Sequence, residues 1–265
     1  MTSTPARLIR ILSTLGLALG LSMGQAQADE PLNIVSSGGF APAYKALAPL
    51  YEQQHGARLQ AAWGPSMGQT VNAIPARLAR HEAIDVVIMV GDSLDQLMQS
   101  GQLVAGSKVV LAHSYIACAV AHGAPHPDIG TVDAFREALL KARSVAYSDS
   151  ASGEYIKTRL LDRLGIREQM QGKARQIPAT PVGEMVRQGE ADFGCQQKSE
   201  LMAVPGIDIL GLIPQEIQLD TEFSAAVVAG SPRQAQARQL LQFLSAPDQA
   251  EAIRQTGLEP VSKAP

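Results

Sequence analysis

Residues 85–90 read Asp-Val-Val-Ile-Met-Val, and every residue after the first is apolar. A strand that is covered on both faces has this composition, whereas a strand with one solvated face alternates apolar and polar residues. Doubly covered strands belong to parallel sheets whose crossover helices pack on either side. The run therefore predicts a buried parallel strand inside an α/β fold.

Strands and helices alternate on both sides of this run. The predicted strands are residues 32–36, 58–63, 109–120, 144–148, 175–177, 191–195 and 223–229. The predicted helices are residues 42–55, a helix from Thr70, and residues 93–100, 131–142, 153–164, 181–188 and 232–256, the last with a break near Pro247. Such alternation predicts an α/β fold with parallel sheets.

In two stretches, residues 110–120 and 218–228, the sequence indicates that the chain passes from one lobe to the other. We therefore predict two α/β lobes joined by a two-segment hinge, with a cleft between them. The first lobe is discontinuous and holds residues 29–112 and 222–265. Residues 113–221 form the inserted second lobe.

The first 28 residues have the pattern of a signal peptide. Arg7 and Arg10 precede an apolar run over residues 11–23, and Ala26-Gln27-Ala28 is a small-x-small cleavage site. The alternative is a membrane anchor, but the run is short for a bilayer span. We predict a periplasmic protein that is cleaved after Ala28 and has no membrane span afterwards.

The whole chain holds 22 Lys and Arg against 25 Asp and Glu, for a net charge of −3. Cleavage leaves 20 basic and 25 acidic residues, because it removes two arginines and no acid, and the net charge becomes −5. No stretch gathers basic residues, which argues against a nucleic-acid partner. An acidic chain can still bind a small anion, since local hydrogen-bond donors decide that.

Cys118 and Cys195 both fall in apolar, strand-like runs. An oxidising compartment permits a disulfide, but two buried thiols are the slightly favoured interpretation. The five histidines are scattered, and no Cys/His cluster has the spacing of metal ligands. We predict no metal and no cofactor.

Three loops share one design, since each joins a strand end to a helix start and is rich in Ser and Gly. Glycine lets a backbone approach a ligand, hydroxyls add donors, and helix N-termini leave N–H groups unpaired. Any one such loop is more often a simple helix cap, but several at one sheet edge favour a shared anion site. A fourth, weaker loop surrounds Thr180. The predicted ligand-binding residues of these loops are Ser36, Ser37, Gly38, Ser66, Met67, Ser148, Ser150, Ser152 and Thr180.

Other polar residues are candidates of lower specificity. Arg77 either forms a bidentate ion pair with a ligand carboxylate or lies on a solvated helix face. Gln196 follows a strand end, where ligands bind in α/β sheets. Tyr155, Lys157 and His81 are the candidates for a catalytic base, and no spacing selects among them. No Ser-His-Asp set, G-x-S-x-G elbow or P-loop is found.

Motifs in order along the chain resemble the molybdate-binding periplasmic receptors. They are SSGGF at 36–40, AAWGPSMG at 61–68, DVVIMVGDSLDQLMQSGQL at 85–103, SDSASGEYIKTRLL at 148–161, VRQGEADFG at 186–194 and QLLQFLSAPDQAEAIRQTGLEPV at 239–261. The resemblance implies a type II periplasmic-binding-protein fold and a monomer. It also implies an oxyanion held by Ser37 or Ser36, by Ser66, and by the loops around Ser150 and Thr180.

Two departures separate this chain from the family pattern. Residues 194–197 read GCQQ where the family has a tyrosine, and the segment from Ser66 to Asp85 is longer and contains Arg77. Both features are similar to a subgroup that we associate with aconitate isomerase activity, an allylic proton shift between trans- and cis-aconitate. The resemblance thus implies an isomerase that binds a tricarboxylate. The alternative is a receptor that passes molybdate, tungstate or a small polycarboxylate to an ABC permease.

Overall fold

The computed structural model describes residues 30–178 and 180–261, and the predicted signal peptide lies outside them. A six-stranded sheet has the strand order β11-β4-β10-β3-β1-β2. Strands β1, β2 and β3 are parallel, whereas β10 is antiparallel to both β3 and β4. The strands are β1 (Leu32–Ser36), β2 (Leu59–Trp63), β3 (Val86–Val90), β4 (Val109–Ser114), β10 (Thr221–Val227) and β11 (Glu259–Pro260).

A five-stranded sheet has the order β7-β6-β8-β5-β9. Strand β6 runs parallel to β7 and β8, and β5 runs antiparallel to β8 and β9. The strands are β5 (Ile116–Ala121), β6 (Val145–Ser148), β7 (Ala174–Ile177), β8 (Phe193–Gln197) and β9 (Ile207–Leu212). The sequence did not predict β9, although five of its six residues, Ile-Asp-Ile-Leu-Gly-Leu, are apolar or glycine; most of them are half-buried.

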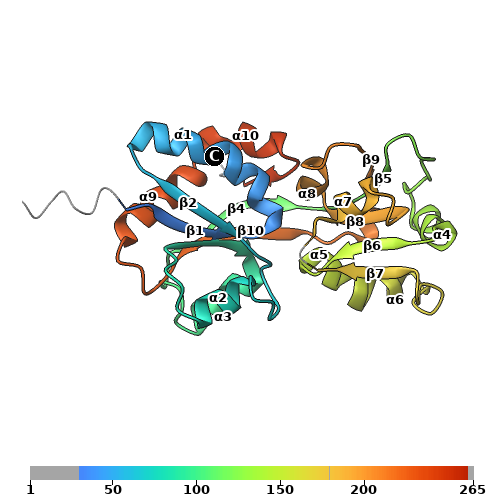
Figure 1. Ribbon diagram of the computed structural model, residues 1–265, viewed down its shortest axis with the longest axis horizontal. Helices are drawn as coiled ribbons and strands as arrows, with labels where there is room; N and C mark the ends of the chain where they lie inside the picture. Colours follow the sequence, from blue (N-terminus) through green and yellow to red (C-terminus); the bar gives the residue numbers. More distant parts are fainter. Residues whose placement is uncertain (1–29, 179, 262–265) are drawn as a thin grey trace, which may run out of the picture. The chain divides into compact units, whose positions relative to one another are not determined.

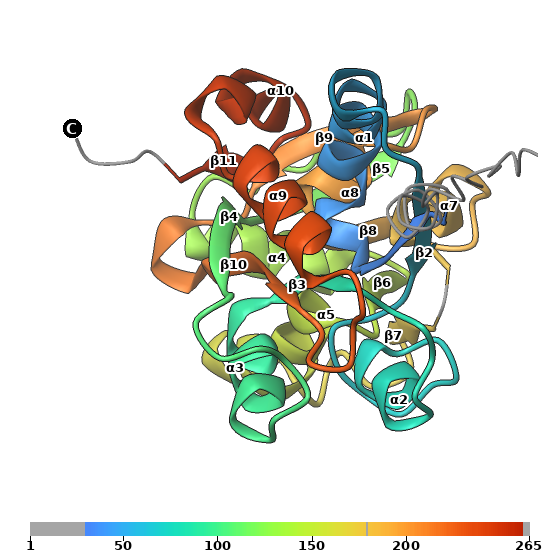
Figure 2. The ribbon, with the colours of Figure 1, turned by 90° about the vertical axis from the view of Figure 1, so that its left-hand side faces the viewer.

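The predicted buried strand at residues 85–90 is confirmed as β3, in which every residue is buried. Helices cover both faces of its sheet (Figures 1 and 2). On one face lie α1 (Ala41–His55), α9 (Gln234–Leu244) and α10 (Ala250–Gln255), which pack on Ile34, Ile88 and Ala225. On the other lie α2 (Ile74–Ala79) and α3 (Gly91–Gln99), which pack on Val35, Val87 and Met89.

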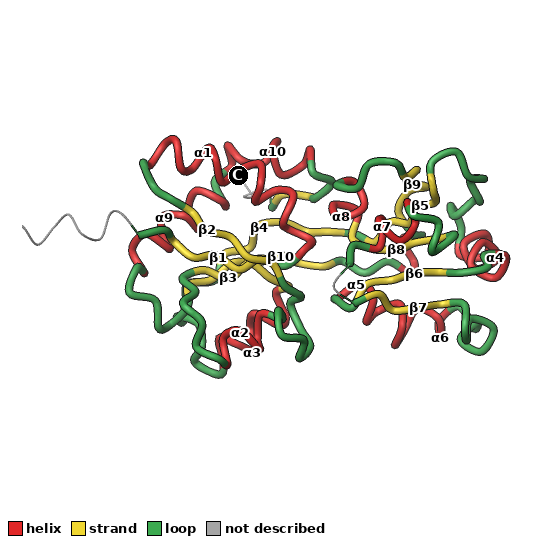
Figure 3. Tube along the Cα trace, in the orientation of Figure 1, coloured by secondary structure: helices red, strands yellow, loops and turns green. Residues whose placement is uncertain are grey.

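The five-stranded sheet is also covered on both faces, so strands lie between helical layers in both sheets (Figure 3). Side chains of α4 (Val132–Lys141) and of the helical stretch α5 (Ala151–Tyr155), η2 (a π-helix, Ile156–Leu160) and α6 (Leu161–Arg163) pack on one face. Side chains of α7 (Val182–Arg187) and α8 (Lys198–Met202) pack on the other. Short 3-10 turns η1 (Gly38–Phe40), η3 (Gln215–Ile217) and η4 (Pro247–Gln249) complete the described elements.

The predicted long strand over residues 109–120 is two strands. Strand β4 pairs with β10 in the first sheet, and β5 pairs with β8 and β9 in the second, with Tyr115 between them. The chain returns between β9 and β10. Gln218 holds the two passages together, because its side chain accepts from the Ile116 N–H at 2.8 Å and donates to the Ile116 carbonyl at 3.0 Å. The lobe boundaries at residues 112, 113, 221 and 222 stay a prediction.

Two helix starts differ from the prediction. Helix α2 begins at Ile74 rather than near Thr70, with Pro75 in its first turn. A helix from Thr70 would place Pro75 inside it, where the missing N–H breaks a backbone hydrogen bond. Helix α5 begins at Ala151, so Ser152 and Gly153 lie inside the helix. None of the helices in the described ranges is long and apolar enough to cross a membrane.

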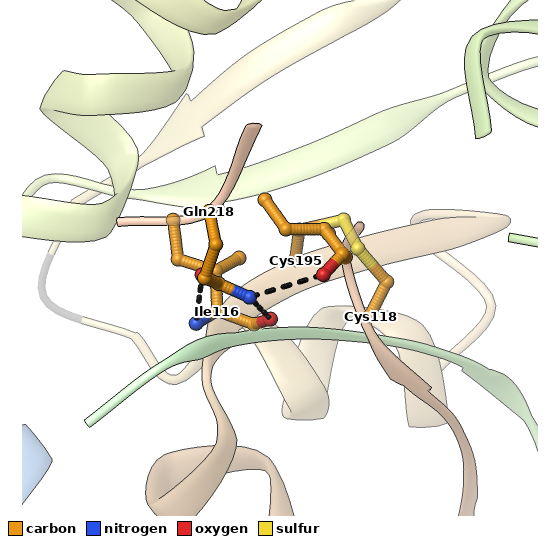
Figure 4. The surroundings of a disulfide bond; sticks show 5 residues. Ile116, Cys118, Cys195 and Gln218 are labelled. Carbon is orange, nitrogen blue, oxygen red and sulfur yellow. Dashed lines mark hydrogen bonds between the residues drawn. A yellow bond between two sulfur atoms is a disulfide. The ribbon is translucent and has the colours of Figure 1, made fainter. Parts of the chain in front are cut away.

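The cysteine prediction was wrong, because Cys118 and Cys195 form a disulfide in place of two buried thiols. The two residues are direct partners in the antiparallel register of β5 and β8, with Cα atoms 4.1 Å apart. Their side chains point into the core beneath α4 and α5. Figure 4 shows the bridge beside Ile116 and Gln218, at the passage between the sheets.

Asp85 anchors the first sheet through a buried polar network. Its carboxylate accepts from the Ser231 hydroxyl at 2.6 Å, from the Arg233 guanidinium at 3.0 Å and from the Asn33 N–H at 2.8 Å. These partners come from β1 and from the segment between β10 and α9. The carboxylate therefore joins the first strand to the C-terminal helices.

We expect Asp85→Ala to lower the free energy of unfolding by about 3–5 kcal/mol, since it breaks a buried ion pair from one side. Urea unfolding followed by circular dichroism measures this. Asp248→Ala is the control, because Asp248 is exposed, and it should shift stability by less than about 0.5 kcal/mol. Equal effects of the two variants would contradict the role of Asp85.

The disulfide closes a loop with a sequence separation of 77. Constraint of the unfolded chain by a loop of this length contributes about 4 kcal/mol. We expect a reducing agent to lower the guanidinium midpoint of the wild type and to leave that of a Cys118→Ala/Cys195→Ala variant unchanged. A wild-type midpoint that does not respond to full reduction, verified by thiol titration, would contradict this.

Candidate functional site

Loops from the carboxyl ends of strands in both sheets meet at a cavity of about 200 Å³. The first sheet supplies the loops after β1 and β2, and the second supplies those after β6, β7 and β8. Ligand sites of small molecules lie at such strand ends in α/β proteins. The residues that line the cavity are Gly38, Trp63, Gly64, Pro65, Asn72, Ser148, Asp149, Ser150, Thr180, Pro181, Gln196 and Glu200.

The loop after β1 comes close to the second sheet through two glycines. A Cβ at Gly38 would lie 2.2 Å from Oε1 of Glu200, so a larger residue here would displace the end of the Glu200 side chain. Ser199 donates its hydroxyl proton to the Gly39 carbonyl at 2.7 Å. The turn after β1 and the start of α8 are thus in direct contact at the pocket.

Three serines of the first sheet stand behind the pocket lining. Ser36 is buried and donates to the Ser37 carbonyl at 3.0 Å. Ser66 is buried and its oxygen accepts from the Val90 N–H at 3.0 Å, which leaves its own proton to donate. The Ser37 hydroxyl is buried with no hydrogen-bond partner among the described residues. An unpaired buried hydroxyl is costly, and it lies next to Gly38 of the lining.

The loop after β6 carries three predicted serines. Ser148 and Ser150 line the cavity, whereas Ser152 lies behind them, with its hydroxyl 3.2 Å from that of Ser148. The Ser150 N–H donates weakly to the Ser148 hydroxyl at 3.4 Å. Gly153 is required here, because a Cβ on it would lie 1.6 Å from the Ser148 carbonyl oxygen.

Gln196 and Thr180 also line the pocket, as predicted for ligand-binding residues. Gln196 is buried, and its Oε1 accepts from the Val182 N–H at 3.0 Å. This bond ties the end of β8 to the first residue of α7. Thr180 is exposed on the loop that precedes α7.

Trp63 forms an aromatic wall of the pocket at the end of β2. The Lys45 ammonium lies 5.1 Å from the centre of its ring, and Tyr44 meets the ring edge-on. Trp63 was not predicted from the sequence, because a lone aromatic residue at a strand end is common. Its position beside the Gly64-Pro65 loop was the available signal.

Glu200 is the most unusual group of the pocket, and the sequence analysis missed it. It lies in the first turn of α8 and is half-buried. Removal of its carboxyl group from water raises its pKa to about 8, the negative charge of Asp149 acts in the same direction, and a hydrogen bond with Gln196 opposes both. The signal in the sequence was the position of Glu200, three residues after the end of β8. Gln196 on the same strand was a predicted ligand-binding residue.

Asp149 is the second carboxyl group of the lining. It belongs to a loop that was predicted to bind an anion, but only the serines of that loop were predicted as ligands. No described residue forms a hydrogen bond or an ion pair with its side chain. The pocket thus holds two carboxyl groups, one of which is strongly desolvated.

The structure does not bring Arg77, His81 or Met67 into this lining. The Arg77 Nε lies 2.7 Å from a Glu82 carboxylate oxygen, so its charge is satisfied within its own segment. His81 is exposed, with a φ of 56° just after α2. Arg77 therefore gives no support to a polycarboxylate ligand.

Two predicted candidates for the base, Tyr155 and Lys157, are also engaged elsewhere. Tyr155 is buried, and its hydroxyl donates to the Ile217 carbonyl at 2.7 Å. Lys157 donates to the Gln176 side chain at 3.2 Å and lies 3.8 Å from Glu154. Neither is among the described residues that line the pocket, and their hydrogen bonds tie α5 and η2 to η3 and β7.

Comparison with known proteins gives both a close sequence relative and similar folds. The chain is 51% identical over 240 residues to an aconitate isomerase of a Pseudomonas species, which covers 91% of this chain and 92% of that one. The fold is similar to the periplasmic molybdate-binding protein of Azotobacter vinelandii, with a TM-score of 0.71 and 20% identity over 88% of this chain and all of that one. The sulfate-binding protein of Mycobacterium tuberculosis aligns with a TM-score of 0.69 and 19% identity, over 88% and 87% of the two chains.

These likenesses confirm the predicted type II periplasmic-binding-protein fold. They also confirm the predicted resemblance to molybdate-binding proteins and to the aconitate isomerase subgroup. Residues 32–259, nearly the whole described chain, match the model of one family. The chain belongs to the family of bacterial extracellular solute-binding proteins.

Proposed function

We propose that this chain is an aconitate isomerase that interconverts trans-aconitate and cis-aconitate in the pocket between the two sheets. The likeness to the Pseudomonas enzyme supports the reaction. The observation in the structure that carries the proposal is the pair of carboxyl groups, Asp149 and Glu200, in a lining otherwise made of neutral groups. A proton shift requires a titratable group at the reacting carbon, and these two groups meet that need.

In aconitate, a methylene group and a C=C bond share a central carbon that bears a carboxylate. A base takes a proton from the methylene carbon, and the electron pair of that C–H bond forms the new C=C bond to the central carbon. The electrons of the old double bond take a proton at the former vinylic carbon. The new double bond is cis or trans according to the conformation of the methylene arm when its proton leaves.

Asp149 is the base in this proposal. Its side chain lines the cavity with that of Glu200, and its charge contributes to the raised pKa of Glu200. Its carboxylate has no hydrogen-bond partner in the described part of the chain and is free to take the proton. The same carboxyl group then returns the proton to the other end of the allylic system, and Asp149 ends as it began.

Neutral donors would hold the substrate carboxylates. The Ser148 and Ser150 hydroxyls, Thr180 and the Gln196 amide all line the cavity. The buried Ser37 hydroxyl, which precedes Gly38 of the lining, lacks a partner among the described residues, as expected for a group that bonds a ligand. Negative charge that develops on the carboxylates during the shift would strengthen these bonds.

The protein works in the periplasm under this proposal, as a monomer from which the signal peptide is cleaved after Ala28. Membership of the extracellular solute-binding family supports this location. An alternative function is a receptor that passes molybdate to an ABC permease. The observation that favours it is the absence of Lys, Arg and His from the residues found to line the pocket within the described ranges.

We expect the purified mature chain to convert trans-aconitate to cis-aconitate and to reach the same equilibrium mixture from either isomer. Chromatography of the two isomers over time measures this. Thermal shifts with aconitate and with molybdate are the comparison, since a ligand at a thousandfold excess over Kd adds about 4 kcal/mol to apparent stability. A large shift with molybdate, with no turnover and no shift with aconitate, would establish the receptor instead.

We expect Asp149→Asn to lower kcat by about 10²–10⁴, the contribution of a positioned base. Binding of tricarballylate, the saturated tricarboxylate that has no double bond to shift, should persist, because the variant removes a negative charge and no donor. Asp133→Asn is the matched control, since Asp133 is exposed in the first turn of α4. Full activity of Asp149→Asn would assign the base elsewhere.

A further inference from the structure

Glu200 is held where its ionised form has no compensating charge. Oε1 lies against Gly38 of the first sheet, and Gln196 forms a hydrogen bond with the carboxyl group. Asp149 faces it from the loop after β6, and a negative charge there raises the pKa of Glu200. The carboxyl group of Glu200 therefore lies between the backbone of Gly38, the side-chain amide of Gln196 and the carboxyl group of Asp149.

The charged side chains on the elements packed against α8 interact with groups other than Glu200. They are η1, β5, β8, β9, α1 and α7. On α7, Arg187 pairs with Glu184 at 2.7 Å, and on β9 the Asp208 carboxylate contacts His122 and His126. On α1, Lys45 lies over the Trp63 ring and Glu52 accepts from the Leu59 N–H, while His55 stacks on Tyr51.

A bound anion makes the ionised form of Glu200 still less favourable. Ligand, Asp149 and Glu200 would share a small cavity with no cationic side chain among its described lining residues. A carboxylate can only accept hydrogen bonds, whereas a carboxylic acid can donate one. Glu200 is therefore compatible with an anionic neighbour only when it carries its proton.

We propose that Glu200 acts as a neutral carboxylic acid that donates a hydrogen bond to the bound anion, so that the pocket takes up its anion together with one proton. The inference rests on the proposed function only in that this pocket is the ligand site. It holds for a tricarboxylate and for a metal oxyanion alike. Beside a tricarboxylate, the donated bond would also strengthen as charge develops on the substrate carboxylate.

The pKa of about 8 sets the expected pH dependence. Glu200 is mostly protonated below pH 8, and the binding-competent form is lost as the pH rises through that value. We expect the Kd of tricarballylate for the wild type to rise about tenfold from pH 7 to pH 9. The Kd for Glu200→Gln should stay flat, because glutamine is a neutral donor of the same shape.

Isothermal titration at pH 9 in two buffers of different ionisation enthalpy measures proton uptake directly. We expect close to one proton per tricarballylate for the wild type and close to none for Glu200→Gln. Glu168→Gln is the matched control, since Glu168 is exposed and outside the lining, and it should behave as the wild type. Molybdate in place of tricarballylate serves as the second probe.

The results separate this inference from the proposed function. Proton-coupled binding of either anion supports the role of Glu200 even in a protein that does not isomerise aconitate. An active isomerase that binds tricarballylate with the same pH dependence in Glu200→Gln as in the wild type overturns it. Failure of the folded wild type to bind either anion also overturns it.

A second measurement does not depend on the variant being fully native. Infrared difference spectra of the wild type should contain the C=O stretch of a protonated carboxylic acid at pH 7 and lose it near pH 10. The Glu200→Gln spectrum should lack this band, whereas that of Glu168→Gln should retain it. A carboxylate spectrum for Glu200 at pH 7 would exclude the neutral acid.

Discussion

The passage of the chain between its two sheets is the constraint on which the rest of the structure depends. Strands β4 and β5 are separated by one residue, Tyr115, yet belong to different sheets. Gln218 joins this outward passage to the return by bonding both backbone groups of Ile116. The Cys118–Cys195 bridge then fixes β5 to β8 two residues from the end of that strand pair at Ile116 and Gln197. With the strands held in this way, the segments after β1, β2, β6, β7 and β8 open on one pocket.

Much of this fold was predictable because its signals are local. The apolar run of β3 predicts a doubly covered strand, and Thr131 predicts the start of α4, where its hydroxyl accepts from the Ala134 N–H at 3.1 Å. The features that were missed depend on partners far along the chain. Cys118 and Cys195 pair because β5 and β8 place them in register, and the sequence of neither strand predicts that register. The division of residues 109–120 into β4 and β5 likewise follows from which strands lie beside each half.

The site shows the same division between local and long-range information. Ser148, Ser150, Thr180 and Gln196 were predicted from loops at strand ends, and they line the pocket. Arg77 was predicted from its charge, but a partner five residues away, Glu82, takes that charge. Glu200 carries no motif at all. Its character comes from the glycine that lets the turn after β1 reach it and from Asp149, which lies 51 positions earlier in the chain.

A pocket without cationic side chains selects anions differently from one built on arginine. A fixed positive charge attracts any anion of suitable size, including sulfate and phosphate, and its strength changes with salt. Neutral donors bind tightly only an anion whose oxygens accept a hydrogen bond from each of them. A buried donor left without an acceptor costs desolvation free energy. A protonated carboxyl group extends this principle, since it adds a donor without adding charge. On a scaffold shared with oxyanion receptors, the proposed base Asp149 would supply what simple binding lacks, a group that can take a proton from carbon.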